Sequence, residues 1–164
     1  MNSEKYTIPA GAGIGHVHLK VSDLERSLQF YRDLLGFELT TMYGQQAAFI
    51  SAGGYHHHIG LNVWHSKGAP PAPVNAVGLY HTAIRYPERK DLANILRRLM
   101  AARYPLTGAS DHGVSEALYL NDPDNNGVEL YWDRPKELWN YQPDGSIEMY
   151  TRALDLEGLL AESG

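Results

Sequence analysis

The feature that most constrains the fold is an order of elements that occurs twice along the chain. The first half reads as a strand at "GIGHVHLKVS" (13–22), a helix at "SDLERSLQFYRDLLGF" (22–37) and three short strands. The first strand alternates in the period-two manner of a half-buried strand. Ser22 and Glu25 predict a capping box for the helix. The three strand candidates are "FELTTMY", "AAFISA" and "HHIGLNVW".

The same order returns after the proline-rich joint "SKGAPPAPVNA" (66–76). A strand at "VGLYHTAIRY" precedes a helix whose apolar residues recur at helical spacing, and three more strands follow at "YPLTG", "SEALYLND" and "GVELYWD". A repeat of about 60 residues in this order predicts two similar modules. We therefore expect one α+β domain over 1–164, with modules at 13–64 and 77–134 and a C-terminal extension at 135–164.

Composition excludes several classes of function. A net charge of -5 and a pI near 5.9 argue against nucleic-acid binding as the main task. The chain has no cysteine, so disulfides, thiolate ligands and cysteine nucleophiles are excluded. Its first residues lack a secretory signal and no apolar run could span a bilayer, so we expect a cytoplasmic protein with no membrane partner.

Several of these stretches resemble the vicinal oxygen chelate superfamily of glyoxalases, bleomycin-resistance proteins and extradiol dioxygenases. The resemblance covers about residues 13–135. The resemblance is most specific in three stretches that are similar to catechol 2,3-dioxygenase sequences. These are "GGYHHHIGLN", "GLYHTAIRYP" and "DHGVSEALYLNDPDNNGVELYWDRP". It implies two paired βαβββ modules that form an open, cup-like mixed sheet with a metal inside.

Three residues are the candidate metal ligands. His16 and His18 share one face of the first strand, and His81 occupies the place in the second half that corresponds to His16. Glu129 lies in an apolar strand, where a carboxylate is costly unless it is paired or bound to a cation. The resemblance selects His16, His81 and Glu129. Two imidazoles and one carboxylate are typical of non-heme Fe(II) oxygenases, and Mn(II), Zn and Ni remain alternatives.

The resemblance also suggests catalytic residues. Glyoxalase-type relatives supply a carboxylate at the position of Gly60, which here leaves a coordination position open. The acid-base histidine of extradiol enzymes falls on His57, although the spacing leaves His56 and His58 as alternatives. Tyr119, ten residues before Glu129, and His112 correspond to further active-site residues.

These residues favour a metal-dependent extradiol dioxygenase that opens a catechol-type aromatic diol with O2. The alternatives are a glyoxalase-like lyase or epimerase and a non-catalytic small-molecule-binding resistance-type protein. We also expect a homodimer, because an edge strand of each sheet needs cover.

Overall fold

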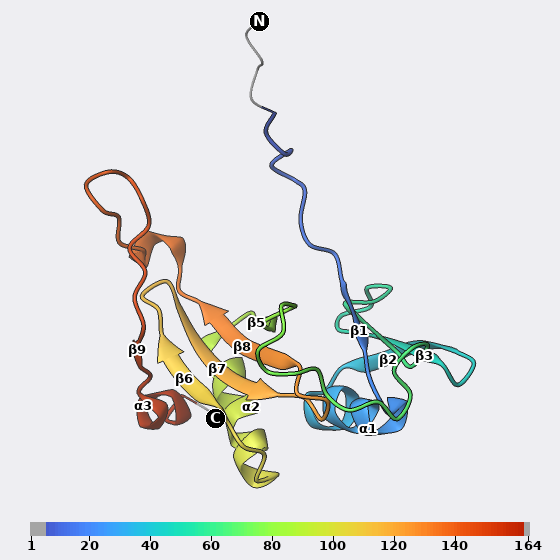
Figure 1. The fold of residues 1–164 in the computed structure, drawn as a ribbon. Coiled ribbons are helices and arrows are strands. Elements are labelled where there is room, and N and C mark those ends of the chain that lie inside the picture. The colour runs from blue at the N-terminus through green and yellow to red at the C-terminus, as the bar shows by residue number, and fades with distance from the viewer. Residues whose placement is uncertain (1–5, 163–164) are drawn as a thin grey trace, which may run out of the picture.

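The computed structural model describes residues 6–162 and contains two βαβββ modules side by side (Figure 1). The first module forms a sheet of order β1-β4-β3-β2, in which β1 and β4 are parallel and the other pairs antiparallel. Its elements are β1 (Val17–Lys20), α1 (Leu24–Leu28), η1 (Gln29–Leu34), β2 (Glu38–Tyr43), β3 (Ala47–Ser51) and β4 (Ile59–Asn62).

The second module repeats this plan with the sheet order β5-β8-β7-β6-β9, and β5 is parallel to β8. Its elements are β5 (Thr82–Tyr86), α2 (Arg89–Ala101), β6 (Gly108–Asp111), β7 (Ser115–Asn121) and β8 (Gly127–Asp133). The extension adds η2 (Lys136–Leu138), β9 (Arg152–Ala153) and α3 (Leu156–Leu160). The α+β class with two βαβββ modules is confirmed. The strand predicted at "YPLTG" is present but displaced, because β6 begins at Gly108, the last residue of that stretch.

The first helix differs from the expected one in two ways. Its N-cap is Asp23, whose side chain accepts a hydrogen bond from the Arg26 amide, so the capping box predicted at Ser22 was wrong. After Leu28 the helix widens into the π-helical η1, where the Leu35 amide donates to the Phe30 carbonyl five residues back at 2.9 Å.

Contacts between the modules come from helices and a turn. The hydroxyl of the fully buried Tyr31 donates to Asp122 at 3.0 Å, and the Ser22 hydroxyl donates to Asp124 at 2.5 Å. Arg98 of α2 donates to the Leu34 carbonyl at 2.6 Å. Asp122 and Asp124 belong to the turn that immediately precedes β8, so packing between the modules also fixes where β8 begins. Strands β1 and β5 lie at the free edges of their sheets.

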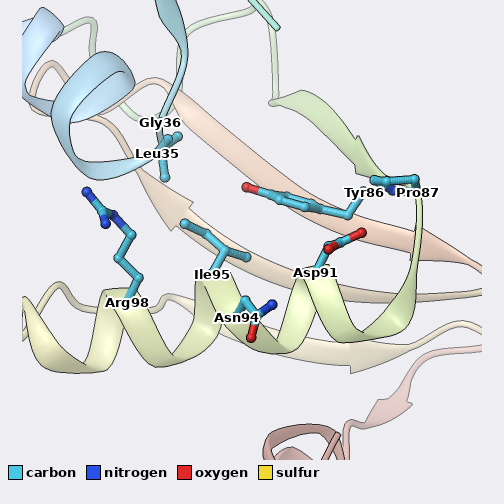
Figure 2. A pocket seen from close by; sticks show the side chains of 8 residues that line it. All are labelled: Leu35, Gly36, Tyr86, Pro87, Asp91, Asn94, Ile95 and Arg98. Carbon is cyan, nitrogen blue, oxygen red and sulfur yellow. The ribbon is translucent and has the colours of Figure 1, made fainter. Parts of the chain in front are cut away.

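A groove of about 620 Å³ runs along this seam between η1 and α2 (Figure 2). Its residues are Leu35, Gly36, Tyr86, Pro87, Asp91, Asn94, Ile95 and Arg98. In Figure 2 the Arg98 side chain extends from α2 toward the end of the first helix. The groove lies where the modules meet, because its residues come from both of them. None of the candidate site residues lines it.

The extension packs on the second module. Helix α3 lies against α2 and fully buries Leu159. Arg89 of α2 forms ion pairs with Glu116 at 2.7 Å and with Glu162 at 2.5 Å, so it joins the extension to β7. Throughout residues 6–162, each helix is too short or too polar to cross a bilayer.

Candidate functional site

Two predicted ligands meet at the edge of the second sheet. His81 immediately precedes β5, and its Nε2 lies 2.9 Å from Oε2 of Glu129 on β8. Gly127 permits this approach, because a Cβ there would collide with the carbonyl oxygen of Tyr80. The carboxylate of Glu129 is largely buried, with 12% of its side chain exposed. A buried carboxylate is costly unless it is paired or bound to a cation, and the imidazole of His81 is its partner here.

Tyr119 and His112 extend this pair into a row of four side chains. Tyr119 lies opposite Glu129 in the β7–β8 ladder, and its hydroxyl oxygen is 3.0 Å from Glu129 Oε1. Nε2 of His112 lies 2.7 Å from the same hydroxyl. Burial, and then the charge of Glu129, raise the pKa of Tyr119 well above its usual value. The hydroxyl therefore stays protonated at neutral pH, where it can act as a donor.

The remaining predicted ligand, His16, lies in the first module beside the histidine triplet. Its ring centroid is 4.4 Å from that of His57, and Nδ1 of His57 is 2.7 Å from Nδ1 of His56. Desolvation lowers the pKa of His57, and the neighbouring His16 and His56 lower it further. A neutral imidazole at this place can accept a proton at neutral pH.

The third member of the triplet has a different role. His58 turns away from this group, and its Nδ1 lies 3.0 Å from the Ser51 hydroxyl and 3.3 Å from the Ala52 amide. These contacts hold the loop before β4 against β3. Of the triplet, His57 and His56 share the surroundings of His16.

His18 occupies the space beside Gly60. The two residues are register partners across β1 and β4, and the His18 ring packs 5.7 Å from Phe49 and 5.5 Å from Trp64 between ring centroids. Desolvation and the neighbouring His16 lower the pKa of His18. The expected opening at Gly60 is therefore partly filled by an aromatic group.

His81 Nε2 and Glu129 Oε2 are spaced as two ligands of one divalent cation would be. Ligand atoms about 2.0–2.2 Å from one ion at adjacent coordination positions lie roughly 3 Å apart, and His81 Nε2 and Glu129 Oε2 are 2.9 Å apart. Nδ1 of His81 is buried without a hydrogen-bond partner in the described chain. Among residues 6–162, no group of three His, Cys, Asp or Glu side chains is placed to hold an ion. One chain thus carries two separate parts of the expected ligand set.

Sequence reasoning missed one contact of this site. The Tyr150 carbonyl, in the extension, lies 2.8 Å from Nδ1 of His112. Residues 38 positions apart and outside the repeated modules give no pattern that links them. The role of Gly127 had a visible signal, since the glycine ends the turn directly before Glu129 in "DPDNNGVEL".

A buried carboxylate and an imidazole at ligand spacing lie in the second of two βαβββ modules. The model described as the Glyoxalase/Bleomycin resistance protein/Dioxygenase superfamily matches residues 13–130, and the chain belongs to this superfamily.

Its relatives include dioxygenases. The chain is 43% identical over 152 residues to a catechol-2,3-dioxygenase of Bacillus subtilis, covering 92% of this chain but only 52% of that protein. It is 32% identical over 132 residues to biphenyl-2,3-diol 1,2-dioxygenase 3 of Rhodococcus globerulus, covering 78% and 68% of the two chains. A glyoxalase/dioxygenase from Nostoc punctiforme has the same fold, with a TM-score of 0.64 at 17% identity and 81% and 100% coverage.

Proposed function

We propose that the protein is an extradiol dioxygenase, which opens a catechol-type ring with O2 and uses a metal held by His16, His81 and Glu129. The observation that carries the proposal is the row from His112 through Tyr119 and Glu129 to His81. This row places the Tyr119 hydroxyl and the His112 imidazole directly beside the two side chains that are spaced as metal ligands. The dioxygenases among the relatives support the same reaction.

Fe(II) is the metal we propose, because two imidazoles and a carboxylate leave open positions for other ligands. When bound, it supplies these positions and the one-electron chemistry through which O2 reacts with an aromatic ring. Neutral His57 accepts a proton from the second hydroxyl of the diol, and the imidazolium returns it later in the reaction. When the diol binds, the single proton of the Tyr119 hydroxyl turns from the two acceptors beside it, Glu129 and His112, to an oxygen of the diol.

The space beside Gly60 favours this function over a glyoxalase-like lyase. Such a lyase would take a fourth carboxylate ligand from position 60. Here the residue is glycine, and its Cβ position lies 2.9 Å from two carbons of the His18 ring. A side chain at position 60 therefore requires that His18 move.

We further propose a homodimer in which each metal site takes His16 from one copy and His81 with Glu129 from the other. Both β1 and β5 have free edges, and the segments before them expose large apolar side chains. Ile14 is 98% exposed and Tyr80 is 89% exposed. A twofold axis that pairs the first module of each copy with the second module of the other would cover both edges and complete two sites.

The function is tested with protein that is loaded anaerobically with Fe(II) and then given O2 with catechol or biphenyl-2,3-diol. We expect one O2 to be consumed for each ring opened, and both to be lost in Glu129→Gln together with bound iron. A loaded protein that isomerises a hemithioacetal but leaves the diols intact would instead be a lyase. A protein that binds the diols without turnover would be a binding protein.

Mixed dimers test the shared site. His16→Ala and Glu129→Gln each remove one ligand from every site and should be inactive alone. If sites form between copies, co-expression gives mixed dimers with one complete site, and random exchange restores about a quarter of the wild-type activity. The double variant His16→Ala/Glu129→Gln, expressed alone, is the control and should stay inactive. A monomer in light scattering, or no recovery in proven mixed dimers, would contradict the shared site.

A further inference from the structure

The C-terminal extension reaches the row of candidate site residues. Strand β9 pairs with β6, so that Asp111 lies opposite Arg152, and the extension passes directly beside His112. The Tyr150 carbonyl is 2.8 Å from Nδ1 of His112, and the Tyr150 amide donates to the His112 carbonyl at 3.3 Å. We propose that Tyr150 is a positioning residue, which holds His112 in the tautomer that carries its proton on Nδ1.

The tautomer follows from what each neighbour of the imidazole can do. A carbonyl oxygen only accepts hydrogen bonds, so Nδ1 must carry a proton to bond the Tyr150 carbonyl. In the neutral ring Nε2 then has a free lone pair, which faces the Tyr119 hydroxyl at 2.7 Å. The Thr151 hydroxyl could donate to Nδ1 instead, but it lies 3.5 Å away, at the limit of a hydrogen bond.

Packing holds the carbonyl of Tyr150 in place. The Tyr150 ring lies on Gly113, where a Cβ would be 2.9 Å from Cε1 of the ring. The guanidinium of Arg152 lies over the same ring, with Cζ 4.0 Å from the ring centroid. On the other side of the turn, Arg134 bonds both carboxylate oxygens of Asp111, at 2.6 and 3.1 Å. His112 is thus fixed between the extension and the second module.

The tautomer decides where the proton of Tyr119 goes. That hydroxyl has one proton and two acceptors within reach, His112 Nε2 at 2.7 Å and Glu129 Oε1 at 3.0 Å. With the proton of His112 on Nδ1, Nε2 competes for the tyrosine proton and leaves the Glu129 carboxylate free to bind a cation. With the proton on Nε2, His112 would donate to Tyr119 and direct the tyrosine proton to Glu129. The extension therefore tunes a candidate metal ligand through two intervening side chains.

The test is a long-range 1H–15N spectrum of the histidine side chains in 15N-labelled, metal-free protein, at a pH above the ordinary imidazole value of about 6.5. We expect His112 to show the Nδ1–H pattern. Gly113→Ala places a methyl group against the Tyr150 ring and should convert His112 wholly or partly to the Nε2–H form. Gly145→Ala is the matched control, because Gly145 has a φ of 83° against 81° for Gly113, and nothing lies within 4 Å of its Cβ position.

The inference rests on the proposed function only for its effect on iron binding, so the two can fail separately. Gly113→Ala should weaken anaerobic binding of Fe(II) roughly 10–100-fold, the usual effect of losing a group that orients a ligand shell, and Gly145→Ala should not. An Nε2–H pattern in the wild type, or an unchanged tautomer in folded Gly113→Ala, would overturn the positioning role. If Gly113→Ala does not fold, Arg152→Ala, which frees one face of the Tyr150 ring, takes its place. An Nδ1–H pattern in a protein that opens no diol would refute the function and leave the positioning role intact.

Discussion

The imidazole of His18 lies against the backbone of Gly60, so closely that a Cβ on residue 60 would be 2.9 Å from both Cγ and Cδ2 of the ring. The two residues are paired across parallel strands, and Phe49 is the next partner of Gly60 on the other side. A row across the sheet therefore consists of an imidazole, a glycine and a phenyl ring. This packing requires glycine at position 60, the position where glyoxalase-type relatives have a carboxylate ligand.

Gly60→Ala should lower the free energy of unfolding by about 1–3 kcal/mol, as overpacking does. We expect the lower part of that range, because His18 is exposed and its ring can move at the expense of its contacts with Phe49 and Trp64. In His18→Ala the same substitution should cost less. Urea unfolding of both single variants and the double variant measures the coupling. If the two changes in the free energy of unfolding are additive, the His18 ring and residue 60 do not interact.

His57→Phe should leave the iron content nearly intact and reduce ring opening roughly 10²–10⁴-fold, the weight of a positioned acid-base group. Because the pKa of His57 is lowered from its ordinary 6.5, the acid limb of the wild-type pH–rate profile should fall below that value and be lost in the variant. His65→Phe, at an exposed histidine outside the cluster, is the control. Loss of iron in His57→Phe would make the triplet a source of ligands.

Two neighbouring tyrosines should differ in their effect on stability. Tyr31→Phe removes a buried hydrogen bond to the Asp122 carboxylate and should cost about 1.5–3 kcal/mol, the range for a bond to a charged group. Tyr104→Phe removes a 2.7 Å bond to the Asn121 carbonyl and should cost about 0.5–1.5 kcal/mol. Denaturant unfolding compares them. Equal costs would show that the bond between the modules contributes no more than a neutral one.

Asp111 should make the protein sensitive to acid. Its bonds with Arg134 lower the pKa of the carboxyl below its ordinary 3.8. A lowered folded-state pKa gives stability that is present above the unfolded value and is lost as the pH falls through the folded one. The difference in unfolding free energy between the wild type and Asp111→Asn should therefore be largest near neutral pH and shrink below pH 3.8. A constant difference across this range would contradict the assignment.

The sequence predicted what depends on local pattern. The offset of ten residues between Tyr119 and Glu129 is a cross-strand pair of the β7–β8 hairpin, so the turn at 122–127 determines their contact. His16 and His18 share a face because they lie in and beside one strand. The roles within the histidine triplet could not be read this way. His57 and His58 precede β4, where the alternation of a strand does not yet apply.

The separation of His16 from His81 and Glu129 within one chain was also beyond the sequence. The repeat indicates that His16 and His81 occupy corresponding positions, but it does not say which modules share a sheet edge. That depends on whether the helices or the sheets of one chain pack together. Here Tyr31, Ser22 and Arg98 make the contacts between the modules, and these side chains lie on or beside helices.

The π-helical turn η1 limits which insertions and deletions the chain can accept. Tyr31 lies within its six residues, and the wider turn sets the direction from which its hydroxyl reaches Asp122. Deletion of a single residue from this turn would replace the wide turn by ordinary α-helical winding and change the direction in which Tyr31 points. Length variation among natural homologues should therefore avoid residues 29–34 and collect in the joint at 66–76, where the chain has no helix or strand.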